Sequence, residues 1–140
     1  MSDSSASAPI DVAAAYFRRL DLGGDIFELF ADDAYMWFPK HPPARGLEEI
    51  RQLVADIVPL WKWVEHAIPY LNYVVDGPMV VVEGRSRGEL SSGGRWTEDD
   101  PSGGRFCNVF DVRGGKIQRL HIYLDPDYAG EDTTRYPWLA

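Results

Sequence analysis

Hydrophobic and polar residues alternate through two runs near the end of the chain, and this alternation predicts a β-hairpin over residues 103–127. Gly114 and Gly115 separate the runs, and a glycine pair allows the positive φ angles of a tight turn. Successive strand side chains point to opposite faces. One face carries Asn108 between Phe106 and Phe110. We therefore expect this face to point inward, with a single amide among aromatic rings.

A third strand is predicted over residues 79–90, again with two unlike faces. One face carries four charged residues in succession: Glu83, Arg85, Arg87 and Glu89. The opposite face is apolar at first and then carries small residues: Val80, Val82, Gly84, Ser86 and Gly88. Because small side chains leave space unfilled, this face predicts a cavity beside Gly84 and Ser86.

Apolar residues at spacings of three and four predict helices over residues 11–20 and 47–58. A short helix capped by Asp25 is expected between them, followed by a strand over 34–38. A long strand is expected over 61–75, with an interruption at Pro69 because proline cannot donate a ladder hydrogen bond. The order of helices first and sheet afterwards predicts a single α+β domain.

The 140 residues suffice for one domain with a sizeable core. We expect this domain to span 10–127, after a disordered N-terminus over 1–9. The tail over 128–140 carries Tyr136 and Trp138 and is expected to pack on or near the pocket. The Gly/Ser/Asp-rich connection over 91–104 is long enough to be a lid, a binding loop or a disordered segment.

Composition narrows the partners and the compartment. The net charge is −8 and no cluster of Lys or Arg is present, which argues against nucleic acid and anionic membranes as partners. The single cysteine, Cys107, excludes an internal disulfide and suits a reducing compartment. No signal peptide and no apolar run of about 18 residues is present, so a cytoplasmic location is expected.

Four stretches occur in an order that is typical of one superfamily. They are YFRRLDLGGDIFELFADDAYMWFP, PPARGLEEI, EHAIPYLNYVVDG and CNVFDVRGGKIQRLHIYLD. Together they cover about residues 10–127. The chain resembles the nuclear transport factor 2-like superfamily, in particular its SnoaL-like and ketosteroid isomerase-like members. The resemblance implies a cone-shaped curved antiparallel sheet, wrapped by two to three N-terminal helices around a pocket. It also implies a homodimer formed through the outer face of the sheet.

The resemblance assigns roles residue by residue. Tyr16 matches the catalytic tyrosine of ketosteroid isomerases, and Asn108 stands where they carry their second oxyanion donor. Their catalytic aspartate is replaced by Phe38, so their proton-transfer chemistry is absent. The limonene epoxide hydrolase set is also absent, since its polar positions are apolar or small here: Met36, Phe38, Gly84, Ser86 and Ile122.

The dehydratase branch of the superfamily, which includes scytalone and bile-acid dehydratases, gives the third comparison. There a tyrosine and an aspartate on the first helix act with a histidine on the following long strand. Tyr16, Asp21 and His66 match these three positions. The carboxylate that partners this histidine on the next strand has no counterpart here, so the match is incomplete.

The residues themselves leave alternatives open. His66 is the best general base in the chain because an imidazole titrates near neutral pH, although Pro69 leaves its facing undecided. Tyr16 is either an oxyanion donor or a core ring with a satisfied hydroxyl. Asp21 either orients His66 or bonds the end of its own helix. Asn108 must bond a neighbour, a water or a ligand if it is buried.

The other two histidines and the cysteine are weaker candidates. His121 falls on the outer face beside Tyr123, where an interface role is expected. His41 lies in a Pro-rich loop, either at a pocket rim or in solvent. The three histidines show no paired spacing, so neither a metal site nor a cofactor is expected. Nothing near Cys107 indicates a reactive thiol.

Three functional hypotheses follow. The first is a cofactor-free lyase or isomerase, of dehydratase or cyclase type, acting on a small apolar molecule with a carbonyl or hydroxyl group. The second is a non-catalytic module that binds such a molecule, and the third is an interaction protein working through the outer sheet face. Under the first two, the pocket lining is predicted to include Phe38, Val82, Gly84, Ser86, Phe106, Phe110, Leu120, Ile122 and Leu124.

Overall fold

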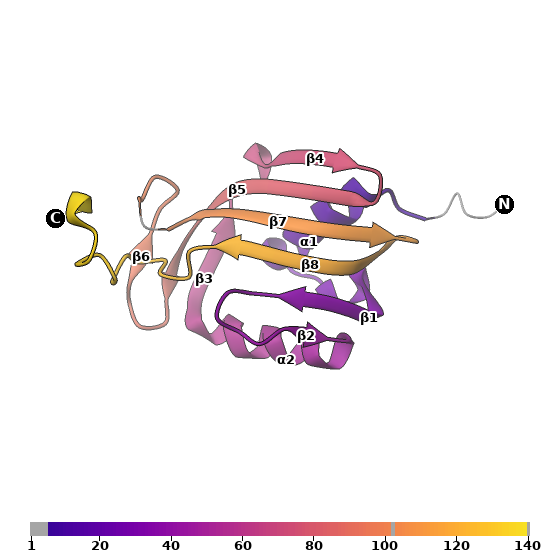
Figure 1. Ribbon diagram of the computed structural model, residues 1–140, viewed down its shortest axis with the longest axis horizontal. Helices are drawn as coiled ribbons and strands as arrows, with labels where there is room; N and C mark the ends of the chain where they lie inside the picture. Colours follow the sequence, from indigo (N-terminus) through magenta and orange to yellow (C-terminus); the bar gives the residue numbers. More distant parts are fainter. Residues whose placement is uncertain (1–5, 102, 140) are drawn as a thin grey trace.

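The computed structural model describes residues 6–101 and 103–139. Within them, the two α-helices, with two strands between them, precede the remaining strands (Figure 1). The N-terminal elements are α1 (Pro9–Leu22), the 3₁₀ helix η2 (Ile26–Leu29), β1 (Phe30–Trp37), β2 (Ala44–Arg45), α2 (Leu47–Ile57) and η3 (Val58–Leu60). The remaining elements are β3 (Trp61–His66), η4 (Ile68–Tyr70), β4 (Asn72–Asp76), β5 (Met79–Leu90), β6 (Arg95–Trp96), β7 (Arg105–Arg113), β8 (Lys116–Leu124) and η5 (Pro137–Leu139).

The described strands form one eight-stranded sheet with the order β2-β1-β8-β7-β5-β3, and β4 and β6 also pair with β5. The α+β architecture with a curved sheet is therefore confirmed. The expectation of a purely antiparallel sheet is corrected, because β1 runs parallel to β8, with Met36 opposite Leu120. No turn joins these two strands along the chain, so no hairpin forces them to be antiparallel.

The predicted strand over 61–75 is two strands. β3 pairs with the last part of β5, and β4 pairs with its first part. Between them, the short helix η4 contains Pro69. Proline removes a backbone donor, which ends the ladder at this point. The break gives β5 two successive partners on one edge and leaves His66 as the last residue of β3.

Helix α1 packs on the inner face of the sheet. It begins at Pro9, two residues before the predicted start, and proline is favoured in the first helical turn. Of the predicted disordered N-terminus, residues 1–5 lie outside the described residues. The helix ends at Gly23, whose φ of 99° suits a glycine. The short helix after it is capped as predicted, since Asp25 accepts a hydrogen bond from the Phe27 N–H at 2.8 Å.

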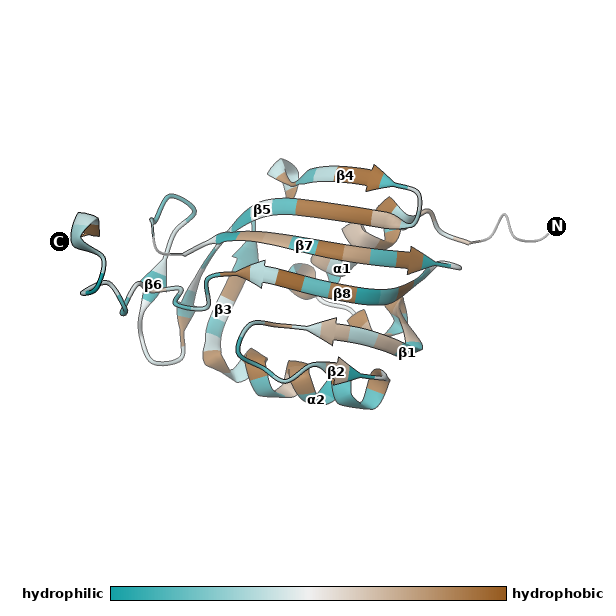
Figure 2. Cartoon of the chain, viewed as in Figure 1, coloured by the Kyte–Doolittle hydropathy of each residue, from teal (hydrophilic) through white to brown (hydrophobic). Residues whose placement is uncertain are grey.

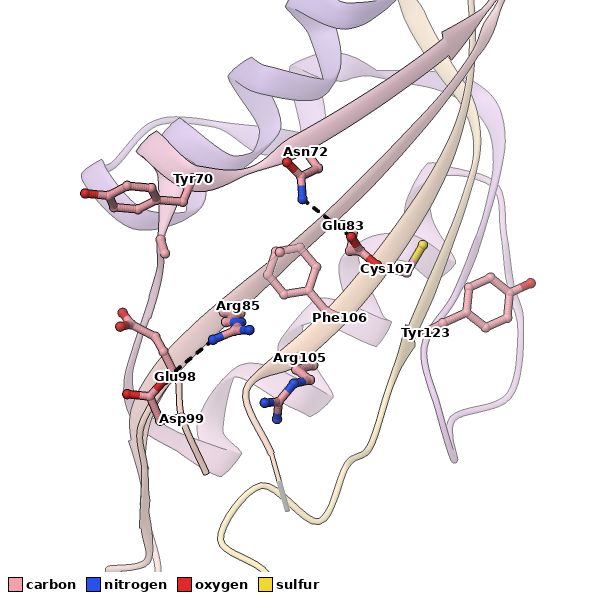
Figure 3. A pocket seen from close by; sticks show the side chains of 12 residues that line it. Tyr70, Asn72, Glu83, Arg85, Glu98, Asp99, Arg105, Phe106, Cys107 and Tyr123 are labelled. Carbon is pink, nitrogen blue, oxygen red and sulfur yellow. Dashed lines mark hydrogen bonds and ion pairs between the residues drawn. The ribbon is translucent and has the colours of Figure 1, made fainter. Parts of the chain in front are cut away.

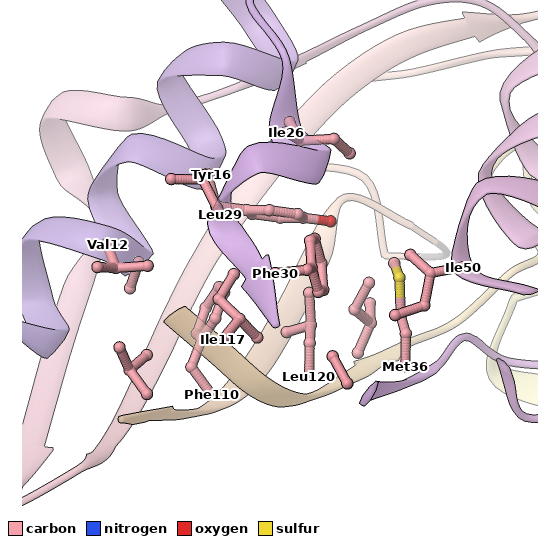
Figure 4. Close-up of a cluster of buried hydrophobic side chains, with 14 of the residues drawn as sticks. Val12, Tyr16, Ile26, Leu29, Phe30, Met36, Ile50, Phe110, Ile117 and Leu120 are labelled. Carbon is pink, nitrogen blue, oxygen red and sulfur yellow. The ribbon is translucent and has the colours of Figure 1, made fainter. Parts of the chain in front are cut away.

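The core lies between the helices and the inner sheet face; apolar residues form a continuous run at the start of β5 and mix with polar residues along β8 (Figure 2). Side chains of α1, β1, α2, β7 and β8 meet there, among them Val12, Tyr16, Phe30, Met36, Ile50, Phe110, Ile117 and Leu120 (Figure 4). Ile50, Phe110 and Leu120 are completely buried. This packing closes the inner face from the turn at residues 77–78 to about the middle of the sheet.

The long connection over 91–104 and the tail meet at the other end of the sheet. Trp96 of β6 is buried, and its ring lies 4.5 Å from that of Tyr128. The tail therefore packs near the sheet at Tyr128. Its remainder does not, since Trp138 is 79% exposed and η5 lies away from the body of the molecule (Figure 1). No helix in the described parts of the chain is long and apolar enough to cross a membrane.

Replacing Ile50 by alanine is expected to lower the free energy of unfolding by about 3 kcal/mol, because it leaves a cavity under α2. The matched control is Ile10→Ala, at a position that is 39% exposed, where a loss below about 1 kcal/mol is expected. Urea denaturation of both variants measures the difference, and equal losses would contradict this description of the core.

Candidate functional site

A small cavity of about 60 Å³ lies between α1 and the inner sheet face. Its walls come from elements distant in sequence, namely Tyr16, Leu20, Phe38, Ile57, Trp61, Val64, His66, Ser86, Phe106, Asn108, Ile122, Leu124 and Tyr128. Three of the predicted catalytic residues, Tyr16, His66 and Asn108, are among them. The cavity can hold a few waters or one small functional group, but not a whole organic substrate.

Asp21 and His66 form a close pair at one wall of this cavity. Asp21 Oδ1 lies 2.7 Å from His66 Nδ1, and Asp21 Oδ2 accepts a hydrogen bond from the His66 backbone N–H at 2.7 Å. The two side chains are 4% and 15% exposed, respectively. A carboxylate only accepts hydrogen bonds, so Nδ1 carries the proton and Nε2 is left with its lone pair.

The position of Asp21 agrees better with this pairing than with helix capping. It lies in the last turn of α1, where the helix dipole disfavours a negative charge. Both of its oxygens bond His66 on β3. Of the two roles that the sequence left open for Asp21, the structure therefore shows contact with His66.

His66 faces inward, which the sequence could not decide across Pro69. Its ring packs edge-on against Phe17 and Phe106, with centroid distances of 5.4 and 5.2 Å. These apolar neighbours hold the ring in place. The hydrogen bond to Asp21 leaves Nε2 as the nitrogen that is able to take a proton.

Tyr16 contributes a phenol from α1. Its ring contacts Phe17, Phe30 and Phe110 edge-on, with centroid distances between 5.3 and 6.4 Å. Burial raises the pKa of Tyr16 above its ordinary value. The hydroxyl therefore keeps its proton at neutral pH and can act as a hydrogen-bond donor.

Asn108 supplies an amide from β7 that the protein does not saturate. It is 2% exposed, and its Oδ1 has no hydrogen-bond partner among the described residues. An unsatisfied buried polar group costs about 1–3 kcal/mol. Because Asn108 lines the cavity, a donor group bound there could satisfy this oxygen.

The predicted lining holds in part. Phe38, Ser86, Phe106, Ile122 and Leu124 line the cavity. Three other predicted residues are not in its lining and are completely buried in the core: Val82, Phe110 and Leu120.

The expected free space at the small residues of β5 is corrected. A side chain at Gly84 would collide with Leu71 and Phe106, and one at Gly88 would collide with Trp96. The space beside these glycines is thus already filled by side chains from other elements. Ser86, by contrast, does line the inner cavity, and its hydroxyl accepts a hydrogen bond from Trp96 Nε1 at 3.2 Å.

A larger hollow of about 550 Å³, the vestibule, adjoins the cavity. Four residues line both spaces and form the wall between them; we call them the neck residues: Phe38, Ile57, Trp61 and Tyr128. Sequence reasoning missed Trp61 and Tyr128 as site residues. The only signal for Tyr128 was its place in a tail expected near the pocket, and Trp61 gave none beyond starting a strand.

His41 lies at the rim of the vestibule. Its Nε2 is 2.8 Å from Asp56 Oδ2, and its Nδ1 is 2.7 Å from the Pro42 carbonyl oxygen. These hydrogen bonds, the one to Asp56 first, raise the pKa of His41 and favour its charged form. Of the two places that the sequence allowed for His41, the structure shows the pocket rim.

The largest hollow, about 730 Å³, is on the outer face of the sheet between β5, β7 and η4 (Figure 3). Its charged side chains bond one another: Arg85 pairs with Asp99, and Asn72 donates to Glu83. None of the predicted catalytic residues lines it. We therefore place the candidate site in the smaller inner cavity, where polar groups lack partners.

The described residues contain no group of three His, Cys, Asp or Glu side chains able to hold a metal ion. Cys107 lies on the outer side of β7, where burial raises the pKa of its thiol. The polar side chains that line the inner site are an imidazole, two phenols, a hydroxyl, an amide and an indole: His66, Tyr16, Tyr128, Ser86, Asn108 and Trp61.

Comparison with protein families shows the family to which this chain belongs. The family model for the SnoaL-like domain matches residues 13–120. The chain belongs to the SnoaL-like family. Like other nuclear transport factor 2-like proteins, this SnoaL-like domain combines N-terminal helices with a curved sheet.

Solved structures with the same fold include proteins of several descriptions. A nuclear transport factor 2-like protein from Anabaena variabilis is 22% identical, with a TM-score of 0.70, over 91% of this chain and 94% of that one. A putative SnoaL-like polyketide cyclase from a Jannaschia species is 19% identical, with a TM-score of 0.65, over 84% and 85% of the two chains. TerC, co-crystallised with polyporic acid, is 18% identical, with a TM-score of 0.67, over 85% and 92%.

At these identities the likeness shows the fold alone. No curated protein matches this chain.

The Asp21 contact predicts the tautomer of His66. In ¹⁵N NMR spectra of the neutral imidazole, His66 is expected to carry its proton on Nδ1. Asp21→Asn has one acceptor oxygen for two donors, so the Nδ1–H signature should weaken. His41 and His121 are internal controls whose signals should stay unchanged. An Nε2–H tautomer for His66 in the wild-type protein would contradict this geometry.

Proposed function

We propose that this SnoaL-like domain is a cofactor-free acid/base enzyme, a lyase or isomerase of dehydratase or cyclase type. Its substrate is a largely apolar molecule with a carbonyl or hydroxyl group. The observation that carries the proposal is the Asp21–His66 pair, at 2.7 Å, on the wall of a cavity that Tyr16 and Asn108 also line. These are the parts of a general base and its oxyanion donors.

In the proposed mechanism, His66 Nε2 removes a proton from the carbon next to the substrate carbonyl. Asp21 holds the ring and stabilises the imidazolium that forms, as the carboxylate of a catalytic triad does. The electron pair moves to the carbonyl oxygen, which accepts hydrogen bonds from the Tyr16 hydroxyl and the Asn108 amide. In a dehydration, the electrons then return to expel a β-hydroxyl, and the proton on His66 leaves with it as water.

The alternative is a binding module that holds the same kind of molecule without chemistry. The loss of the isomerase aspartate at Phe38 supports it. The binding module would be favoured further if His66 had no carboxylate partner and pointed away from Asn108. The Asp21–His66 pair on the wall lined by Asn108 supports the catalytic proposal instead.

The catalytic proposal is tested with β-hydroxyketones, whose dehydration gives enones that absorb in the near ultraviolet. For a substrate that the wild-type protein turns over, His66→Gln should lower kcat by about a hundredfold or more. Tyr16→Phe and Asn108→Ala should each lower it by roughly a hundredfold, as the loss of an oxyanion donor does.

Matched controls separate chemistry from folding in this test. Tyr70→Phe and Asp76→Asn change an exposed phenol and an exposed carboxylate outside the site, and kcat should stay within about twofold. Full activity in all three site variants would reject the assignment. If the wild-type protein and all variants bind a ligand but none of them turns it over, the binding module is favoured.

We also propose that two copies pair through the outer sheet face. Four side chains from β1 and β8, the outer aromatic cluster, lie in contact there: Tyr35, Trp37, His121 and Tyr123. Tyr123 is 47% exposed, and His121 Nε2 is buried without a partner in the described residues. Burial and the nearby Arg119 charge lower the pKa of His121, so its ring is neutral and suited to an apolar interface.

Sedimentation velocity tests this pairing. The wild-type protein should sediment as a dimer, and Tyr123→Glu as a monomer, because a charge at the centre of a self-complementary interface meets its own copy. Leu22→Glu places the same charge on a residue that is 79% exposed at the end of α1, and it should remain dimeric. A monomeric wild-type protein at micromolar concentration would reject the dimer.

A further inference from the structure

The inner cavity and the adjoining vestibule differ in what they can hold. The inner cavity, at about 60 Å³, admits one functional group, whereas the vestibule, at about 550 Å³, has the volume of a typical small-molecule site. Phe38, Trp61 and Tyr128 separate them, with Trp61 edge-on to both of the other rings. A substrate whose reactive group reaches His66 must therefore leave its body in the vestibule.

Most of the vestibule wall is apolar, but its rim is not. Lys40 and His41 lie there, and Asp56 is the only carboxylate in the lining. Asp56 bonds His41, so the charges of these two side chains offset each other. No carboxylate among the described residues lies within ion-pair distance of Lys40. One positive charge therefore remains beside an apolar hollow, in a chain whose net charge is −8.

The backbone at Lys40 is unusual. Residues 38–41 form a turn closed by a hydrogen bond from the His41 N–H to the Phe38 carbonyl at 3.1 Å. Pro39 occupies the second place, and Lys40 occupies the third with a φ of 68°. That place normally requires glycine, and Lys40 is the only non-glycine residue with a positive φ in the described chain. Strain of this kind concentrates at functional sites.

We propose that the vestibule is a separate subsite for the apolar body of the substrate, and that Lys40 binds an anionic group on that body. The substrates would then be amphipathic organic anions, such as aromatic or polycyclic carboxylates. The assignment rests on the proposed function, because it places the reactive carbonyl or hydroxyl in the inner cavity. The binding of a suitable anion at the vestibule can nevertheless be measured without any turnover.

Two fluorescent probes separate the contributions of charge and apolar surface. 8-Anilino-1-naphthalenesulfonate carries an anion, and N-phenyl-1-naphthylamine has the same rings without it. The wild-type protein should bind the sulfonate several-fold more tightly. Lys40→Met should weaken sulfonate binding by about fivefold, the contribution of a solvent-exposed ion pair, and leave the neutral probe within twofold. Lys62→Met, the same change on β3 outside both spaces, should affect neither probe.

Two further variants locate the probes and examine the turn. Ser92→Trp narrows the vestibule and should weaken both probes. Lys40→Gly removes the same charge but fits the positive φ, so it should lose sulfonate affinity while its Tm rises. Unchanged sulfonate affinity in both Lys40 variants, or unchanged binding of both probes by Ser92→Trp, would overturn the proposal.

The variant His66→Gln shows whether a negative result concerns the Lys40 subsite or the proposed catalytic function. It should bind both probes as the wild-type protein does, because the probes occupy the vestibule alone. Weaker binding of both probes would place them in the inner cavity and overturn the division into two subsites. If the Lys40 variants bind normally while His66→Gln loses turnover, only the substrate class is wrong. If His66→Gln retains turnover while Lys40→Met loses sulfonate affinity, the catalytic assignment fails and the subsite stands.

Discussion

The two hydrogen bonds that Asp21 accepts from His66 connect the end of α1 to the end of β3. They satisfy a backbone N–H where the strand stops, and they fix which ring nitrogen carries the proton. β3 ends at His66, which pairs with Ser86 of β5, and the next backbone N–H, of Ala67, bonds the Arg85 carbonyl. The carboxylate of Asp21 adds a contact from α1 to this end of the strand, and so contributes to both the shape and the chemistry of the inner site.

The sequence predicted much of the sheet and little of what fills it. Strict alternation indicated β5, β7 and β8, and with them the inward position of Asn108. The resemblance brought Tyr16, Asp21 and His66 into one hypothesis, and the structure places them together. Periodicity could not show that Leu71 and Phe106 fill the space at Gly84, since residues far apart in sequence make that contact. The parallel pairing of β1 with β8 was missed for the same reason.

The neck residues show a second limit of local patterns. Tyr128 follows the last strand in a polar tail, and Trp61 begins a strand at the sheet edge. Neither position differs from an ordinary core position in sequence. The two residues line the same wall only because the fold places β3 and the tail beside the end of β1. There Trp61 contacts both Phe38 and Tyr128. Similarly, the strain at Lys40 depends on a backbone angle, for which its neighbour Pro39 was the only hint.

The cost of the polar groups argues for chemistry over simple binding. An apolar ligand would be held well by apolar walls, and replacing a buried ion pair with packed hydrophobic residues is often neutral or stabilising. This cavity instead contains an amide with an unpartnered oxygen and a histidine paired with a carboxylate against the helix dipole. Each of these lowers stability compared with an apolar wall. A catalytic site needs polar groups that can exchange a proton or form hydrogen bonds with a reacting molecule, which explains the loss of stability. A site that only binds an apolar ligand does not need them.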